Sequence, residues 1–113
     1  MFQIQNLTSD SRQKQTLVLP DSTSIVLELF FIPMQFGWFI SSLTYGDFVL
    51  TGVRIVNSPN MLYQFRNQIP FGLKCVTQGD REPSQLEDLS SGAVKLYILT
   101  RAEVEQYVEY LSG

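Results

Sequence analysis

The side chains that most often carry out chemistry in proteins are scarce in this sequence of 113 residues. It contains no histidine, the residue that serves most often as a general base or metal ligand. Its single cysteine, Cys75, can form neither an intrachain disulfide nor a thiolate cluster for zinc. The seven glycines are dispersed, so no glycine-rich phosphate loop is present. We therefore expect no metal and no cofactor, and we interpret Cys75 as a buried, inert thiol.

Carboxylates are the remaining candidates for acid–base chemistry. Two neighbouring pairs, Asp80 with Glu82 and Glu87 with Asp88, occur in a polar stretch between residues 78 and 92. Solvation in such a loop keeps carboxyl pKa values ordinary, and nothing in the sequence places either pair in a shared cleft. Their spacing is also not that of an EF-hand calcium loop. We interpret both pairs as structural or solvating groups and predict that the protein is not an enzyme.

Aromatic side chains are abundant, with eight Phe and five Tyr beside the single Trp38, whereas only 17% of the residues are charged. Together with Phe36 and Phe39, Trp38 could stack on a carbohydrate or hold a peptide, although packing in a strand core is the more frequent role. A small domain cannot bury every such ring, so we expect some of them at contacts with other chains.

The charge distribution argues against a nucleic-acid partner. The net charge is −3, and the eight basic residues are scattered from Arg12 to Arg101 rather than clustered. Seven carboxylates and three basic residues follow from Asp80 onward, a local charge of −4 that is typical of a solvated face, with a basic partner as the alternative. The apolar run over residues 29–34 is too short to span a membrane. Because the first residues also lack a secretory pattern, we expect no membrane contact and synthesis in the cytoplasm.

Short β-strands separated by turn signals are predicted along most of the chain, over residues 15–19, 24–32, 37–45, 48–56, 72–77 and 93–99. Gly46-Asp47 suits a tight turn between two of them. Residues 61–67 fit either a helical turn or an extended crossing. Residues 6–14 are polar and fit either a loop or a mobile arm, and such an arm would extend over residues 1–14. We expect a single domain over residues 1–113, all-β and mainly antiparallel: a small barrel or sandwich of five to seven strands with one C-terminal α-helix.

The helix is predicted over residues 100–112. Thr100 and Glu103 have the S/T-x-x-E spacing of a capping box, in which the two residues satisfy each other's backbone N–H groups. One stripe of the helix is apolar, because residues of that kind recur at helical spacing at Val104, Tyr107, Val108 and Leu111. We expect the helix to begin within one residue of Thr100 and to pack on the sheet.

The order of short motifs from Gly37 onward resembles that of the small baseplate plug proteins of contractile-tailed phages, of the cyanophage or myovirus type. The likeness covers about two-thirds of the chain. It rests on the order and spacing of Gly37-Trp38-Phe39-Ile40, Tyr45-Gly46-Asp47, Gly52-Val53-Arg54-Ile55-Val56, Asn60-Met61-Leu62, Ile69-Pro70-Phe71-Gly72, Arg81-Glu82-Pro83 and Leu96-Tyr97-Ile98-Leu99.

The resemblance implies a structural virion protein that plugs the tail tube at the central hub of the baseplate and catalyses nothing. Its partners would be the hub, spike and tail-tube proteins and symmetric copies of itself, without nucleic acid or membrane. Since arms and loops can conform to neighbours, we predict contact residues there: Arg12, Lys14, Ile69, Pro70, Phe71, Arg81 and Pro83. The alternatives are a free-standing β-sandwich module that binds a peptide or carbohydrate through Trp38 and neighbouring aromatics and, least favoured, an enzyme that uses the loop carboxylates.

Overall fold

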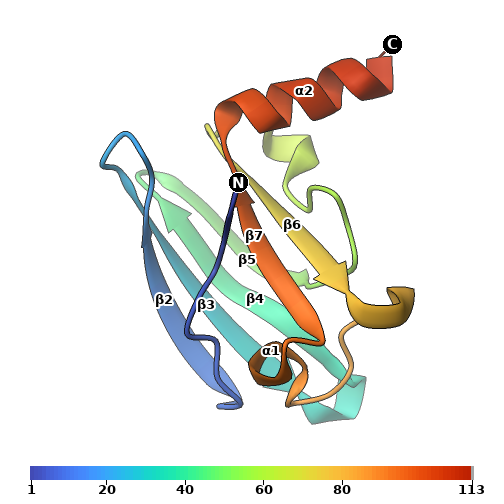
Figure 1. Cartoon of the computed structure of the whole chain (residues 1–113). Helices are drawn as coiled ribbons and strands as arrows, with labels where there is room; N and C mark the ends of the chain where they lie inside the picture. Colours follow the sequence, from blue (N-terminus) through green and yellow to red (C-terminus); the bar gives the residue numbers. More distant parts are fainter. Residues whose placement is uncertain (113) are drawn as a thin grey trace.

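Seven short strands form two antiparallel sheets in the computed structural model, which describes residues 1–112 (Figure 1). The larger sheet has the order β2-β3-β4-β5, with the bounds Arg12–Val18, Ser24–Ile32, Gly37–Tyr45 and Phe48–Arg54. The smaller sheet has the order β1-β7-β6, with the bounds Phe2–Gln3, Val94–Leu99 and Gly72–Thr77. The predicted all-β, mainly antiparallel class is confirmed as a sandwich-like fold rather than a closed barrel.

Alternation along β3 and β4 determines which face of the larger sheet is buried. Ile25, Leu27 and Leu29 are at most 1% exposed, whereas the residues between them are half-buried. In β4 the alternation is interrupted, because Leu29 pairs with Ile40 while Glu28 pairs with Ser42. Ser41, between those two partners, therefore forms a β-bulge. Because of the bulge, the next apolar side chain of β4, Leu43, again points into the core.

The hairpin between β4 and β5 closes at Gly46-Asp47, as predicted. Tyr45 pairs with Phe48, and Gly46 has a φ of 57°, a left-handed value that glycine adopts without a Cβ clash. The strand after this turn is shorter than predicted, because β5 ends at Arg54. A short 3-10 helix, η1 (Pro33–Gln35), connects β3 to β4 at the opposite end of the sheet.

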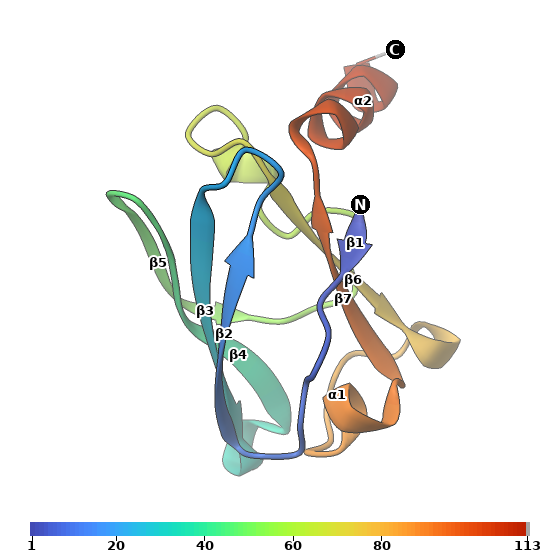
Figure 2. The same cartoon turned by 60° about the vertical axis from the view of Figure 1, so that its left-hand side comes forward.

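The N-terminal segment contributes one strand to each sheet, so the alternative of a mobile arm over residues 1–14 is wrong, whereas the alternative of a loop fits the stretch between β1 and β2. Phe2 pairs with Ile98 of β7, Ile4 is 2% exposed, and β2 already begins at Arg12 (Figure 2). The strand was missed between residues 12 and 14 because its half-buried positions carry polar side chains. The Gln13 amide, for example, accepts a hydrogen bond from the backbone N–H of Thr8 at 3.0 Å.

Three further short helical segments of the described chain lie outside the predicted strands. A 3-10 helix, η2 (Tyr63–Phe65), occupies the stretch for which a helical turn and an extended crossing were both open. The polar loop before β7 contains another 3-10 helix, η3 (Gln78–Asp80), and one α-helical turn, α1 (Asp88–Ser91).

The C-terminal helix, α2 (Arg101–Ser112), begins one residue after Thr100, as predicted. The backbone N–H of Thr100 donates to the Glu103 carboxylate at 3.0 Å, and the backbone N–H of Glu103 donates to Thr100 Oγ1 at 3.3 Å, so the capping box is formed. Only the first part of the apolar stripe is covered, with Val104 4% exposed and Leu111 51% exposed. The helix lies across the end of β7 instead of along a sheet face, which differs from the expected packing (Figure 1).

No helix within residues 1–112 has both the length and the apolar character that a membrane crossing requires.

Candidate interaction surface

The predicted contact residues at 69–72 belong largely to the core. Phe71 is 0% exposed and packs edge-on against the Tyr45 ring at 5.3 Å between centroids, and Ile69 is 2% exposed. The prediction of an interface through Ile69 and Phe71 is therefore wrong. The turn before them directs these side chains inward, because the backbone N–H of Ile69 donates to the carbonyl of Phe65. Pro70 is half-buried and lies between two surface grooves.

The loop around Arg81 and Pro83 is held by hydrogen bonds between its own residues. The Arg81 guanidinium makes two hydrogen bonds, of 3.1 and 2.5 Å, with the carboxylate of Asp88, a residue that is only 2% exposed. The same carboxylate accepts the backbone N–H groups of Ser84 and Gln85 at 2.8 and 2.9 Å. Because Pro83 is buried, its prediction as a contact residue is wrong. Arg81 is exposed, but its guanidinium is already bound to the carboxylate of Asp88.

Asp88 has a structural role, as we interpreted it. Burial raises the pKa of its carboxyl group, but the hydrogen bonds from Arg81 and from the backbone of Gln85 and Ser84 outweigh burial and lower the pKa below 3.8. Of the other predicted pair, Glu82 accepts the backbone N–H of Asn57 at 3.0 Å. The Asp80 side chain lies outside the described part of the structure.

Trp38 cannot stack on a ligand, because it is 0% exposed. Its ring packs on Phe31 at 5.5 Å between centroids, and its indole N–H donates to the backbone carbonyl of Gln85 at 3.1 Å. The alternative of a binding module that uses Trp38 is therefore contradicted. Of its two aromatic neighbours in sequence, Phe36 is 69% exposed and Phe39 is half-buried.

Cys75 is fully buried, as we predicted. Burial, with a further contribution from the negative charge of Glu82, raises the pKa of its thiol to about 12. A thiol with such a pKa is protonated at neutral pH and is a poor nucleophile. Among the described residues, no three His, Cys, Asp or Glu side chains come together as a metal site would require.

Four residues on the outer face of the larger sheet form a continuous row, which we call the arginine–phenylalanine row: Arg12, Phe30, Phe39 and Arg54. They are register partners across all four strands. The two phenylalanine rings lie 5.9 Å apart between centroids, and a guanidinium lies over each of them, Arg12 at 5.5 Å and Arg54 at 5.4 Å. Within residues 1–112 neither arginine forms an ion pair.

The β3–β4 turn beside this row exposes two further large apolar side chains. Met34 is 92% exposed and Phe36 is 69% exposed. Phe36 has φ 48° and ψ 49°, the left-handed region that costs a residue with a Cβ of the order of 1 kcal/mol. Arg54 holds the turn in place by donating to the carbonyls of Gln35 and Phe36 at 3.2 and 3.1 Å.

Gly37 permits this close approach of Arg54. A Cβ added at Gly37 would lie 2.7 Å from the guanidinium carbon of Arg54, which is closer than side chains tolerate. The glycine that opens β4 therefore lets Arg54 both contact the turn carbonyls and lie over the Phe39 ring.

The neighbouring row on the same face is polar. Lys14, which was predicted as a contact residue and is exposed, approaches Glu28 at 3.9 Å, and Glu28 accepts a hydrogen bond from Ser42 at 3.2 Å. Lys14 and Arg12 are thus the predicted contact residues that the structure brings together on one open surface.

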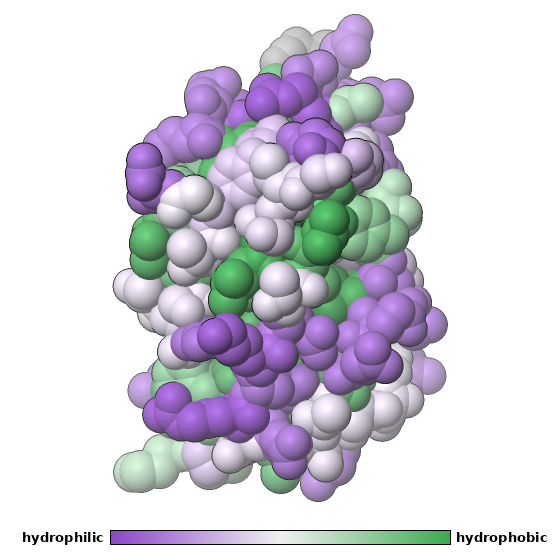
Figure 3. All heavy atoms as spheres, turned by 90° about the vertical axis from the view of Figure 1, so that its left-hand side faces the viewer, coloured by the Kyte–Doolittle hydropathy of each residue, from purple (hydrophilic) through white to green (hydrophobic). Residues whose placement is uncertain are grey.

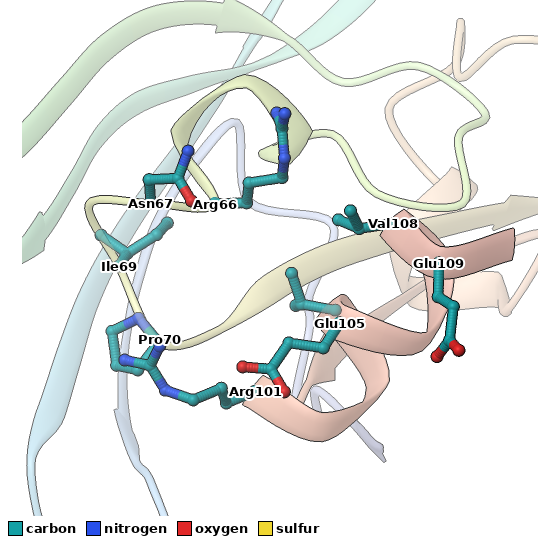
Figure 4. Close-up of a pocket in the computed structure, with 9 residues that line it drawn as sticks. Arg66, Asn67, Ile69, Pro70, Arg101, Glu105, Val108 and Glu109 are labelled. Carbon is teal, nitrogen blue, oxygen red and sulfur yellow. The ribbon is translucent and has the colours of Figure 1, made fainter. Parts of the chain in front are cut away.

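Two grooves flank α2. One, of about 330 Å³, separates α2 from the segment after η2 and is lined by Arg66 and Arg101 together with Glu105 and Glu109 (Figure 4). Its two positive and two negative side chains cancel, so it does not select a ligand by charge. The other, of about 350 Å³, is mainly apolar and lies between Leu19, Ile98 and the start of α2. Viewed from the β2 side, hydrophobic residues form a band between hydrophilic regions (Figure 3).

The sequence matches none of the protein-family models with which it was compared, and no curated protein matches it either.

Sequence reasoning missed Phe30 and Arg54 as members of the arginine–phenylalanine row, although it named Arg12 and Phe39. Phe30 and Phe39 were assigned to strands, but their direction could not be read because β3 carries apolar residues on both faces. These four residues, Arg12, Phe30, Phe39 and Arg54, become neighbours only once the strand register is known. The register depends on the bulge in β4, which no local pattern announces.

Proposed function

We propose that the protein is a non-catalytic structural component of a contractile phage-tail baseplate. In this role it plugs the tail tube at the central hub, and it works by docking onto the neighbouring hub, spike and tube proteins. The docking surface is the arginine–phenylalanine row together with Met34 and Phe36.

The composition of this surface is the observation that carries the proposal. Protein interfaces are enriched in aromatic residues, Met and Arg and depleted in Lys and carboxylates, relative to the remaining surface. Here two phenylalanines and two arginines without ion-pair partners in the described chain share one face of a sheet, and the adjoining β3–β4 turn exposes Met34 and Phe36. The order of motifs from Gly37 onward supports the assignment to the plug proteins.

The geometry also suits a part that must hold firmly and later be released. A sheet face presents its side chains on a rigid backbone, so little conformational entropy is lost on docking. Arginines that lie over aromatic rings are positioned before the partner arrives, yet their outer faces stay open to a partner's carboxylates. Contacts of this kind are individually moderate and involve no covalent bond.

Genetic complementation in a phage that encodes this protein tests the proposal. The gene is deleted, and wild-type protein, Arg12→Glu or Lys95→Glu is supplied in trans. Arg12 lies in the docking surface, whereas Lys95 is exposed on β7 and receives the same change of charge. We expect closed, infective tails with the wild-type protein and Lys95→Glu, and defective tails with Arg12→Glu.

Two outcomes would contradict the proposal at different levels. Closed and infective tails from the deletion phage would overturn the plug function itself. Full complementation by Arg12→Glu, in a background where the deletion is defective, would show that the plug docks through another surface. A reconstruction of the intact baseplate would then locate that surface directly.

A further inference from the structure

Four strands lie at the edges of the two sheets, and the outer edges of three of them are covered, short or irregular. The edge of β6 is covered by residues 58–61, because Ser58 and Cys75 exchange two backbone hydrogen bonds, of 3.0 and 2.9 Å. β1 has only two residues. The register of β5 with β4 is interrupted at Gly52, whose φ of 70° is left-handed. Such irregularities protect an edge strand from pairing with another chain.

β2, at the edge of the larger sheet, is regular over its whole length (Figure 1). All seven of its residues pair with β3 in one uninterrupted register. Just beyond the strand, the backbone N–H of Leu19 donates to the carbonyl of Thr23 at 2.7 Å. Just before it, the carbonyl of Ser11 accepts the N–H of Phe31 at 2.8 Å. Because backbone groups alternate in direction along an antiparallel pair, the odd-numbered residues of β2 are the ones bonded to β3.

The even-numbered residues of β2 therefore turn their backbone N–H and C=O groups away from the sheet. Within residues 1–112 these groups have no hydrogen-bond partner, and they belong to Arg12, Lys14, Thr16 and Val18. An extended segment laid along this edge would satisfy every one of them and would become a further strand of the larger sheet.

The side chains of β2 carry two positive charges and no negative one, and both cations, Arg12 and Lys14, lie on its exposed outer face. Glu28 approaches Lys14 at 3.9 Å, but it lies on β3, on the side of Lys14 away from the open edge. Asp10 lies before the strand, and its carboxylate accepts a hydrogen bond from the Thr8 hydroxyl at 3.4 Å. Carboxylates on an incoming strand can therefore pair with both cations from the open side.

The same charges disfavour a second copy of this chain as the incoming strand. Two paired β2 edges would bring the cations of both copies to one seam, with no carboxylate on either strand, and like charges across a seam are destabilising. Lysine on an edge strand thus opposes pairing between identical edges. It does not oppose an acidic strand.

We propose that β2 binds an extended, acidic segment of a neighbouring protein, which adds to the larger sheet as its new edge strand. Carboxylates of this segment lie opposite Arg12 and Lys14, and an apolar side chain lies opposite Val18, which is 65% exposed. The inference rests on the proposed function for the identity of the neighbour. It adds the kind of segment that docks beside Arg12 and extends the docking surface from the face of the sheet to its edge.

Binding of a synthetic peptide to the purified chain tests the proposal. The probe is an end-blocked peptide of about seven residues, designed to pair antiparallel with β2, with glutamate opposite Arg12 and Lys14 and valine opposite Val18. The control peptide has lysine in place of each glutamate. In an NMR titration we expect the acidic peptide to protect the backbone N–H groups of the four even-numbered residues from hydrogen exchange. It should bind at least about tenfold more tightly than the lysine peptide.

Thr16→Pro blocks the open edge and leaves the pairing with β3 intact. It removes an outward N–H group and places a ring where the partner strand would lie, and proline is tolerated on an edge strand at such a position. Circular dichroism and thermal unfolding would verify that the variant folds. Thr16→Val keeps the N–H group and is the matched control. Binding of the acidic peptide should fall at least about tenfold in Thr16→Pro and change less than about twofold in Thr16→Val.

Lys14→Glu changes the charge of the edge and keeps every backbone group. It should weaken binding of the acidic peptide and strengthen binding of the lysine peptide, each by about threefold or more. This variant keeps the proposal testable if Thr16→Pro does not fold.

Several outcomes would overturn the proposal. They are no binding of the acidic peptide, equal binding of the two peptides, binding that Thr16→Pro in its folded form leaves unchanged, and a Lys14→Glu variant with the preference of the wild type. Self-association of the wild-type chain in sedimentation, abolished by Thr16→Pro, would also overturn it, because a second copy would then occupy the edge.

Complementation of the deletion phage distinguishes failure of this inference from failure of the proposed function. If Thr16→Pro complements fully and Arg12→Glu does not, the docking surface is used but no strand is added at β2. If the deletion phage forms closed, infective tails and the acidic peptide still binds at β2, the plug function fails and the strand addition remains.

Discussion

The loop that holds Arg81 and the arginine–phenylalanine row both present arginines at the surface, but they use them in different ways. Arg81 is bound to the carboxylate of Asp88, which in turn caps two backbone N–H groups of the loop. Arg12 and Arg54 lie over phenylalanine rings instead, and in the described chain no carboxylate pairs with them.

This difference separates an arginine bound to a carboxylate of its own chain from arginines with donors left for a partner, although Arg54 also donates to the carbonyls of Gln35 and Phe36. A guanidinium that already shares two hydrogen bonds with a carboxylate would have to give them up before it could bind another chain. A guanidinium stacked on a ring keeps most of its donors free. The stacked row is therefore the better candidate for an interface, although the loop was the more obvious choice from the sequence.

The largest effect is expected at Phe71, the residue that the sequence assigned to the interface. Phe71→Ala should lower the free energy of unfolding by about 3–5 kcal/mol, because it leaves a cavity beneath Tyr45. Phe36→Ala, the same substitution on an exposed ring, is the matched control and should change stability by less than about 0.5 kcal/mol. Urea denaturation of both variants measures the two changes in the free energy of unfolding. Equal changes would contradict the assignment of Phe71 to the core and of Phe36 to the surface.

Asp88→Asn should have the second largest effect, a loss of about 2–3 kcal/mol in urea denaturation. It removes the negative charge that pairs with Arg81 and weakens the cap on Ser84 and Gln85. Glu87→Gln is the control, since it makes the same change on the adjacent, exposed residue. If both variants unfold at the same urea concentration, the loop is not held by Asp88.

The effect of Asp88 should depend on pH. Its folded pKa lies below 3.8, so the unfolded chain binds the proton more readily than the folded chain does. The stabilisation is therefore complete above the unfolded pKa and is lost as pH falls through the folded pKa. Urea midpoints of wild-type protein and Asp88→Asn should converge as the pH falls through the lowered pKa of Asp88, and a constant difference down to the acid limit would contradict this assignment.

Much of the fold could be predicted from the sequence because it depends on local signals. The bounds of β3, β4 and β6, the turn at Gly46-Asp47 and the start of α2 follow from alternation, glycine and the capping box. The N-terminal strands could not be found in this way. β1 has only two residues, and β2 is stabilised by pairing with β3 instead of by an apolar face of its own.

The candidate surface was harder to predict because it depends on contacts between distant residues. Arg12 and Arg54 are 42 positions apart and meet the two phenylalanines only through the sheet register. Phe71, by contrast, sits in a Pro-Phe-Gly turn that looks exposed in sequence, yet the turn lies over the core. Whether an apolar turn residue points inward is decided by the elements beneath it, which no local pattern contains.

Thr100→Ala tests another polar side chain that, like Arg81 and Asp88, is already hydrogen-bonded within the chain, but here a smaller effect is expected. The Thr100 hydroxyl accepts the backbone N–H of Glu103, so its loss should cost about 0.5–2 kcal/mol of stability. Thr100→Ser keeps the hydroxyl and is the control, with an expected change near zero. Thermal unfolding measures both variants. An unchanged midpoint for Thr100→Ala would show that the cap contributes nothing to the stability of α2.

The smallest effect on stability, and the most informative about function, is expected at Phe36. Phe36→Gly removes a ring that buries little surface and relieves the left-handed strain, while glycine loses more backbone entropy on folding. The free energy of unfolding should therefore stay unchanged or rise by up to about 1 kcal/mol relative to wild type, and it should exceed that of Phe36→Ala, which keeps the strain. Complementation of the deletion phage should weaken equally in both variants, because both lack the ring. A glycine variant that is less stable than the alanine variant would mean that the backbone at Phe36 is not strained. Backbone strain would then no longer distinguish Phe36 from the other exposed aromatic side chains.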